Sequence, residues 1–297
     1  MDLRNKRLNS LMRLHVSSVF QNENAMHSVK LAILDMYEGT PNQGMRCIKD
    51  IIKRYGHVLD WQLFDVRGKA EVPGPEFDLY ISTGGPGSPH DGDGIWDVKY
   101  YDWLQQTWDW NLVPGNPKKH VFFICHSFQM AVKHFGLAEV TQRKSMSFGT
   151  FRCHMTGEGI SEPLFDGLPN PFYIADFRQW QCVQPVEARF EQMGAQILAL
   201  EKIRPHIPLE RAIMAIRFSD EFFGVQFHPE ADPDGMLDHF LHPERRKDII
   251  DNHSEEKYLR MIEHLNDADK IGLTHEVVLP LFLNRAIRAV QAKMAMA

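Results

Sequence analysis

One stretch of the sequence indicates the fold class most clearly, Val121-Phe122-Phe123-Ile124-Cys125-His126-Ser127-Phe128-Gln129-Met130. Its apolar first half is rich in β-branched and aromatic residues, ends at Cys125 and predicts a buried strand. A helical pattern follows the cysteine directly and runs to about His134, where Phe135-Gly136 predicts a glycine cap. A strand that turns sharply into a helix leaves its turn residue at the carboxyl edge of the sheet, where ligands bind in open α/β folds.

A second short apolar run lies far downstream, at Phe223-Gly224-Val225-Gln226-Phe227, and ends in His228-Pro229-Glu230. Pro229 keeps His228 extended. Residues two apart in an extended segment point the same way, so Glu230 can orient the His228 imidazole. A thiol, an imidazole and a carboxylate at strand ends are the parts of an activated cysteine nucleophile, and a helix N-terminus beside the thiol favours its thiolate form.

Each of these residues also has a purely structural interpretation. A lone cysteine is often a small core hydrophobe, and a histidine such as His228 fits a strand end at the surface. The triplet recurs as His242-Pro243-Glu244 with no strand before it. At this second position it predicts the start of a helix, so the triplet alone does not identify a site.

A glycine-rich loop, Thr83-Gly84-Gly85-Pro86-Gly87-Ser88-Pro89, follows an expected strand at residues 77–82. It can present bare backbone N–H groups beside the nucleophile, although an ordinary turn has the same composition. No Gly-Lys-Ser/Thr follows, which excludes a Walker loop, and no GxGxxG opens a helix, so no dinucleotide site is expected.

Strands that alternate with helices predict an α/β fold with an open, mostly parallel sheet flanked by helices. The stretch 145–184 is strand-like and rich in turns. The other expected strands cover residues 29–35, 58–66, 77–82, 197–200 and 212–216, and the expected helices cover 45–55, 95–110 and 127–134.

The chain divides into three expected parts. Residues 1–27 predict a disordered extension, and residues 28–240 predict the α/β domain. Residues 241–297 predict a helical C-terminal extension, with a charged helix-like segment at 244–269 and an amphipathic helix at 276–296. This extension is expected either to pack on the α/β body or to serve in oligomerisation.

Composition limits the partners and the compartment. The net charge of −6 is mixed along the chain, so no nucleic-acid-binding face is expected. No run approaches the roughly 18 apolar residues of a transmembrane helix, and residues 1–27 lack the pattern of a secretory signal. The 4 cysteines match neither a zinc pattern nor a disulfide framework, which predicts no metal site and a cytoplasmic location.

Residues 29–235 resemble the class I glutamine amidotransferase family, in particular its stand-alone GMP synthase-like branch. Three motifs in order carry the resemblance: Ile81 to Ser88, the Cys125 elbow with Gln129, and Gly224 to Glu230. The resemblance implies a flavodoxin-like α/β fold and no cofactor. It also implies hydrolysis of the side-chain amide of glutamine, or of a related γ-glutamyl amide, through a cysteine thioester that releases ammonia.

The resemblance also implies a role for each site residue. Cys125 would be the nucleophile, His228 the general base and acid, and Glu230 its orienting partner. The N–H groups of Gly85 and His126 would form the oxyanion hole, and Gly84 and Gln129 would hold the small-molecule substrate. In the family, ammonia usually passes to a synthetase domain or to a separate synthetase chain.

The chain departs from the family pattern at three places. Phe123 and Ser127 stand where the family elbow Gly-x-Cys-x-Gly-x-Gln has glycines. The segment 178–183 lacks a Ser-His-x-Asp-like motif, and no ATP-pyrophosphatase domain follows residue 240. The alternatives are therefore a γ-glutamyl peptidase or transferase, a catalytically silent protein with a regulatory or binding role, and a thiol-dependent stress protein that has little need of Glu230. A synthetase partner and a homo-oligomer are both expected assemblies.

Overall fold

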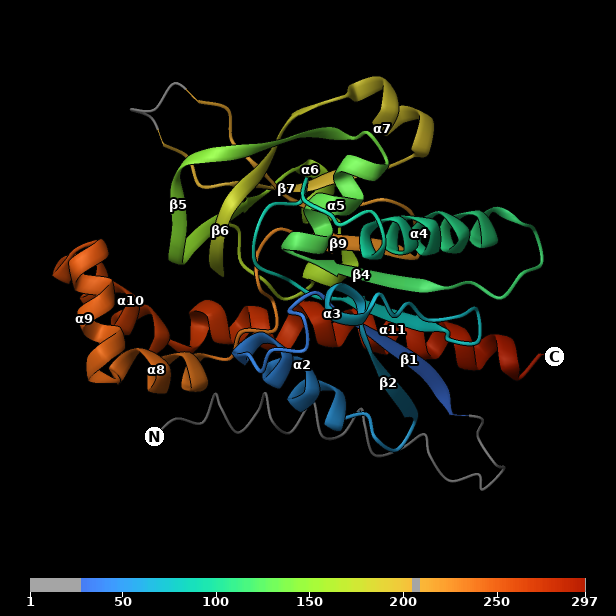
Figure 1. Ribbon diagram of the computed structural model, residues 1–297, viewed down its shortest axis with the longest axis horizontal. Coiled ribbons are helices and arrows are strands. Elements are labelled where there is room, and N and C mark those ends of the chain that lie inside the picture. Colours follow the sequence, from blue (N-terminus) through green and yellow to red (C-terminus); the bar gives the residue numbers. More distant parts are fainter. Residues whose placement is uncertain (1–27, 205–208, 297) are drawn as a thin grey trace.

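A single sheet organises the computed structural model, which describes residues 28–204 and 209–296 (Figure 1). Its 9 strands lie in the order β2-β1-β3-β4-β9-β8-β7-β5-β6. The strands are β1 (Val29–Asp35), β2 (Leu59–Asp65), β3 (Leu79–Ser82), β4 (His120–Ile124), β5 (Ala138–Met155), β6 (Phe172–Pro185), β7 (Gln196–Glu201), β8 (Ile213–Arg217) and β9 (Phe222–Val225). The extension expected at residues 1–27 lies outside the described residues.

The strands β2, β1, β3, β4 and β9 are parallel neighbours. From β9 onward the pairs are antiparallel, through β8, β7, β5 and β6. The predicted α/β fold class is therefore confirmed. The turn-rich stretch 145–184 supplies most of one long antiparallel pair, β5 with β6, and their register shifts between Gln142 and Ser147.

Helices cover both faces of the sheet. Figure 1 shows α11 crossing beneath β4 on the same side as α2, with α4 and α5 opposite. The helices are α2 (Gln43–Lys53), α3 (Val66–Lys69), α4 (Trp96–Leu112), α5 (His126–His134), α6 (Gly157–Ile160), α7 (Glu187–Met193), α8 (Pro233–Leu241), α9 (Pro243–Asn252), α10 (Glu255–Leu265) and α11 (Leu273–Met294), with a 3₁₀ turn at Pro163–Phe165 and a π turn at Ala268–Gly272. The helix start predicted at His242-Pro243-Glu244 is confirmed by α9.

Consecutive residues of β4 point to opposite faces of the sheet. Phe122 joins the apolar cluster under α2 and α11, whereas Phe123 joins the cluster under α4 and α5. This alternation follows from the two-residue period of a strand, and it explains why β4 is apolar without interruption. The sheet is buried on both sides at the position that carries Cys125.

The C-terminal helices pack in two places. Helices α8 to α10 enclose a separate apolar cluster that includes Phe240, Tyr258 and Met261 and contacts β5 and β6 through Phe148 and Phe177. Helix α11 contributes instead to the core of the main sheet. A division of the chain near residue 240 stays a prediction.

Candidate active site

Cys125 forms the turn between β4 and α5 in a backbone conformation that few non-glycine residues adopt. Its φ is 49° and its ψ is −98°, so φ is positive. The Cys125 N–H donates to the Val225 carbonyl at 2.8 Å, and the Gln129 N–H donates to the Cys125 carbonyl at 3.1 Å. The turn is therefore strained and held from both sides, as is common at functional sites.

Ser127 ties this turn to the neighbouring strand. Its hydroxyl accepts from the Ile124 N–H at 3.0 Å and donates to the Ser82 carbonyl at 2.7 Å. The serine thus links β4 to β3 at the point where the glycine-rich loop begins. It thus provides a hydrogen-bond partner for two backbone groups at the buried ends of these strands.

Phe123 fits beside Cys125 because the opposite residue of β9 is Gly224. If residue 224 carried a side chain, its Cβ would lie 3.2 Å from the Phe123 Cβ and 2.8 Å from the Phe128 ring, which is too close. The Phe123 ring packs against Phe218, with ring centroids 5.7 Å apart. The bulky residue of the elbow is therefore accommodated by a glycine on the adjacent strand.

His228 and Glu230 follow β9 and lie beside Cys125. The His228 Nδ1 is 2.8 Å from the Glu230 Oε1. A Cβ placed on Gly84 would lie 2.9 Å from the His228 Cε1 and 3.6 Å from the Cys125 Cβ. The His228 imidazole and the Cys125 side chain therefore both pack close to Gly84. Burial disfavours the imidazolium, but the charges of Glu230 and Cys125 outweigh it and hold the pKa of His228 well above its ordinary value.

Gly85 needs to be glycine because the chain approaches the end of β1 closely. A Cβ at Gly85 would lie 2.7 Å from the Met36 carbonyl oxygen. Within the described residues, the N–H groups of Gly85 and His126 donate to no backbone or side-chain acceptor. Both residues line a cavity that contains Cys125, so two unused backbone donors flank the thiol.

The His126 side chain is buried and neutral at pH 7. Burial, and then the nearby Arg67, lower the pKa of His126 to about 3. Its Nε2 has no hydrogen-bond partner among the described residues. His126 follows Cys125 directly, but the imidazole that has a carboxylate partner is that of His228.

Gln226 is a site residue that the sequence interpretation missed. Its Nε2 lies 3.7 Å from the Cys125 Sγ, and its Oε1 accepts from the Gln129 Nε2 at 3.1 Å. The Gln129 Nε2 also donates to the Trp180 carbonyl at 3.2 Å. The two-residue spacing of Gln226 and His228 was a usable signal, because such residues share a face of an extended segment.

Tyr37 is a second residue that was missed. It follows β1, and a Cβ at Gly84 would lie 3.0 Å from its hydroxyl oxygen. Its side chain lines the cavity that holds Cys125, His228 and Glu230. Burial raises the pKa of Tyr37 above its ordinary value, so this group is a neutral hydroxyl facing the imidazole.

Two cavities open on either side of Cys125 and share Gly85, Pro86 and Phe177 as walls. The first, which we call the His228 chamber, has a volume of about 340 Å³ and includes Tyr37, Asn42, Arg46, Cys47, His228 and Met236. The second, which we call the Gln129 chamber, has a volume of about 220 Å³ and includes His126, Gln129, Met146, Arg178 and Trp180. The thiol can therefore contact molecules from two directions.

Arg178 gives the Gln129 chamber a buried positive charge. Its Nε lies 3.0 Å from the Asp176 carboxylate, and its Nη2 lies 3.5 Å from that of Glu201. The guanidinium is buried, and the two carboxylates hold the pKa of Arg178 above its ordinary value despite the cost of burial. Asp176 and Arg178 lie two residues apart on β6, but Glu201 comes from β7, so no local pattern in the sequence indicates the whole cluster.

The described residues, 28–204 and 209–296, contain no helix that is long and apolar enough to cross a membrane. No cluster of three histidine, cysteine, aspartate or glutamate side chains in that part of the chain has the arrangement of a metal site.

The chain is similar to several solved structures at low sequence identity. A glutamine amidotransferase from Thermotoga maritima superposes with a TM-score of 0.64 at 16% identity, over 88% of this chain and 99% of that one. A protein from Thermoplasma acidophilum that is assigned as a GMP synthase subunit gives 0.53 at 13% identity, over 91% and 98%. The Trypanosoma brucei CTPS glutaminase domain with bound acivicin gives 0.54 at 15%, over 90% and 94%.

No curated protein matches the sequence. The glutamine amidotransferase class-I family matches it over residues 48–244, which is most of the chain and contains Cys125, His228 and Glu230. The three motifs singled out in the sequence lie within that span. The chain belongs to the class I glutamine amidotransferase family.

Proposed function

We propose that the protein hydrolyses the side-chain amide of glutamine through a thioester on Cys125 and releases ammonia. The observation that carries this proposal is the arrangement of Glu230, His228 and Cys125, with a carboxylate 2.8 Å from an imidazole that shares a cavity with a strained cysteine. A carboxylate-oriented imidazole beside a thiol is the arrangement that activates cysteine nucleophiles.

In this mechanism His228 takes the proton of the Cys125 thiol, and the thiolate attacks the amide carbon. The N–H groups of Gly85 and His126 donate to the oxyanion that forms. When the carbon–nitrogen bond breaks, His228 returns the proton to the leaving nitrogen, and ammonia departs. Water then attacks the thioester with His228 as base, which frees glutamate and restores the thiol.

The Gln129 chamber suits the γ-glutamyl part of the substrate. It is small, it lies beside the two backbone donors, and it offers the polar groups of Gln129 and Arg178. Every step uses only groups of the chain and water, so the reaction needs no cofactor. The solved relatives include a CTPS glutaminase domain and the protein assigned as a GMP synthase subunit, which supports delivery of the ammonia to a synthetase partner in the cytoplasm.

A second candidate is a γ-glutamyl peptidase or transferase, and the His228 chamber favours it. Ammonia is far smaller than a cavity of about 340 Å³. Met236 and Pro86 give this chamber apolar walls, and Arg46 and Asn42 add polar groups. A substituted amine, such as the remainder of a γ-glutamyl peptide, would occupy it as the leaving group.

Two assays on the purified chain test these candidates. The first measures the glutamate and ammonia that it releases from glutamine, and the second measures the glutamate that it releases from γ-glutamyl peptides. We expect Cys125→Ala to abolish turnover, whereas Cys182→Ala, which changes a buried thiol outside both chambers, retains it. His228→Asn should lose nearly as much as Cys125→Ala, because members of a triad act as a unit. Faster release from peptides than from glutamine would select the second candidate.

Two outcomes would reject both enzymatic candidates. A folded wild-type chain that releases glutamate from neither substrate would indicate a catalytically silent protein. Ammonia release by Cys125→Ala at the wild-type rate would remove Cys125 from the mechanism.

A further inference from the structure

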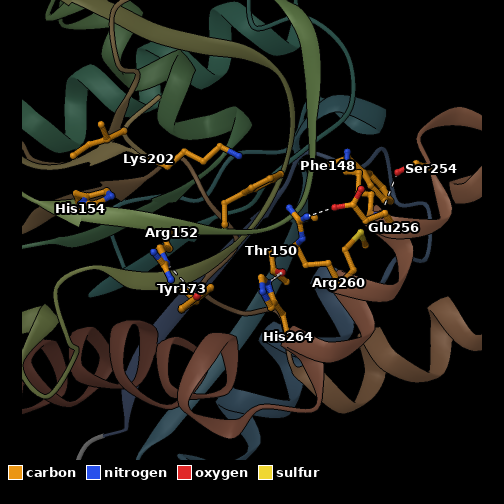
Figure 2. Close-up of a pocket in the computed structure, with 15 residues that line it drawn as sticks. Phe148, Thr150, Arg152, His154, Tyr173, Lys202, Ser254, Glu256, Arg260 and His264 are labelled. Carbon is orange, nitrogen blue, oxygen red and sulfur yellow. Dashed lines mark hydrogen bonds and ion pairs between the residues drawn. The ribbon is translucent and has the colours of Figure 1, made fainter. Parts of the chain in front are cut away.

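A large groove lies between the β5–β6 pair and α10, away from the thiol (Figure 2). Its volume is about 860 Å³, and it shares no lining residue with either chamber beside Cys125. Arg152 comes from β5, Lys202 follows β7, and Lys257 and Arg260 come from α10. We call this feature the basic groove.

Positive charge dominates the basic groove although the whole chain carries a net charge of −6. Its one carboxylate, that of Glu256, is 2.5 Å from the Arg260 guanidinium and is thus already paired. The carboxylate beside Lys202, that of Glu201, lies 2.9 Å from Arg143 and 2.6 Å from Arg204. The carboxylates of Glu256 and Glu201 therefore already have cationic partners.

The two lysine cations of the basic groove lie over aromatic rings. The Lys202 ammonium lies 4.1 Å from the centre of the Phe151 ring, and the Lys257 ammonium lies 5.7 Å from that of Phe148. Neither lysine forms an ion pair with any described carboxylate within 4.0 Å. A cation held over a ring keeps its charge available to a further partner.

Arg152 is held in the same way. Its Nε donates to the Tyr173 hydroxyl at 3.1 Å, and its guanidinium lies 5.8 Å from the Tyr173 ring centre. Figure 2 shows this pair at the same groove as Lys202, on the β-strand side. The fixed cations thus belong to separate elements, and the fold brings them to one cavity.

The cations of the groove also repel one another. Burial lowers the pKa of Lys202, and the charges of Arg204 and Lys257 lower it further, against a partial offset from Glu201. Burial lowers the pKa of Lys257 as well. A bound anion would relieve this repulsion and would offset the cost of partly desolvating both ammonium groups.

We propose that the basic groove binds a small anion with an oligophosphate group, held by Lys202, Lys257, Arg152 and Arg260. Cations on separate elements suit several linked phosphates better than one. Lysine and arginine are the usual partners of phosphate oxygens, and a cavity of this volume is in the ordinary range for small-molecule sites. Ser254 and Thr150 also line the groove.

Isothermal titration of the full chain with inorganic pyrophosphate tests this site. We expect saturable binding with one site per chain. Lys202→Ala and Lys257→Ala should each weaken it about tenfold, equivalent to about 1.4 kcal/mol. Lys247→Ala is the matched control, because Lys247 is an exposed lysine of the neighbouring helix α9, outside the groove, and its affinity should stay within about twofold of wild type.

A second set of titrations identifies the source of the phosphates and separates this site from the catalytic one. Tighter binding of ADP than of pyrophosphate would indicate a nucleotide, and equal binding would indicate the phosphates alone. Cys125→Ala should bind pyrophosphate as the wild type does, whatever its activity. No saturable binding, an equal loss in Lys247→Ala, or binding of a single-stranded oligonucleotide without pyrophosphate would each overturn the proposal.

Discussion

The Gln226 side-chain amide lies 3.7 Å from the Cys125 sulfur and connects it to Gln129, whose Nε2 donates to the Gln226 Oε1 at 3.1 Å. Gln226 is fully buried. Its N–H₂ group can therefore donate to the sulfur only from one direction, fixed by the bond to Gln129. This arrangement favours a negative charge on sulfur, because a donor aimed at a buried anion stabilises it.

We predict that Gln226→Leu slows alkylation of Cys125 by iodoacetamide at neutral pH by about 10- to 100-fold, since one charge-assisted hydrogen bond contributes about 1.5–3 kcal/mol. The turnover number should fall in parallel. Gln105→Leu, which alters an exposed glutamine of α4, is the control. An unchanged alkylation rate in Gln226→Leu would show that the amide does not act on the thiolate.

Gly85→Ala should reduce turnover by about 10²–10³-fold, the loss typical of one missing oxyanion donor. The new Cβ would lie 2.7 Å from the Met36 carbonyl oxygen, so the loop must shift and take its N–H group with it. Gly157→Ala is the matched control, because nothing lies within 4 Å of a Cβ there. Steady-state kinetics of the two variants make the comparison, and equal rates would remove Gly85 from the oxyanion site.

His126 should make the fold sensitive to acid. In the folded chain the pKa of His126 is lowered to about 3, whereas an unfolded histidine titrates near about 6.5. Between these two pKa values the unfolded state binds more protons than the folded state. The stability that the neutral His126 imidazole contributes is therefore complete above about pH 6.5 and is lost progressively as the pH falls toward 3. One proton corresponds to about 1.4 kcal/mol per pH unit.

Urea unfolding at pH 7 and pH 5 measures this effect. The wild-type free energy of unfolding should drop by up to about 2 kcal/mol more than that of His126→Asn over this interval. His57→Asn, which alters an exposed histidine, should behave as the wild type. If His126→Asn loses as much stability on acidification as the wild type, the imidazole is not buried in its neutral form.

The sequence predicted the central strands and the positions of Cys125, His228 and Glu230 because short apolar runs and their end residues are local signals. The Gly-Gly-Pro-Gly loop was predicted for the same reason. The structure brings these residues to one edge of the sheet, because β3, β4 and β9 are parallel neighbours. Their catalytic roles stay predictions.

The residues that were missed act through contacts between distant elements. Arg178 on β6 forms an ion pair with Glu201 on β7, and no spacing in the sequence predicts such a pair. Phe123 stands where the family elbow has a glycine, and only its pairing with Gly224 shows how it fits. Helix α7 was not predicted, since its 7 residues carry a weak pattern.

Helix α11 offers a test of how the chain divides. The Phe282 ring lies 5.0 Å from the Phe122 ring of β4, three residues before Cys125, and Leu283 and Val278 are fully buried in the same core. Phe282→Ala should therefore reduce the free energy of unfolding by about 3–5 kcal/mol. Leu259→Ala, which alters an exposed residue of α10, should change it by less than about 0.5 kcal/mol. Because Phe122 lies on β4, the strand that leads into Cys125, thermal unfolding followed by circular dichroism should report a single transition that moves to lower temperature in Phe282→Ala. A chain that ends at residue 240 and unfolds with the wild-type midpoint would instead establish an α/β domain that folds without α11.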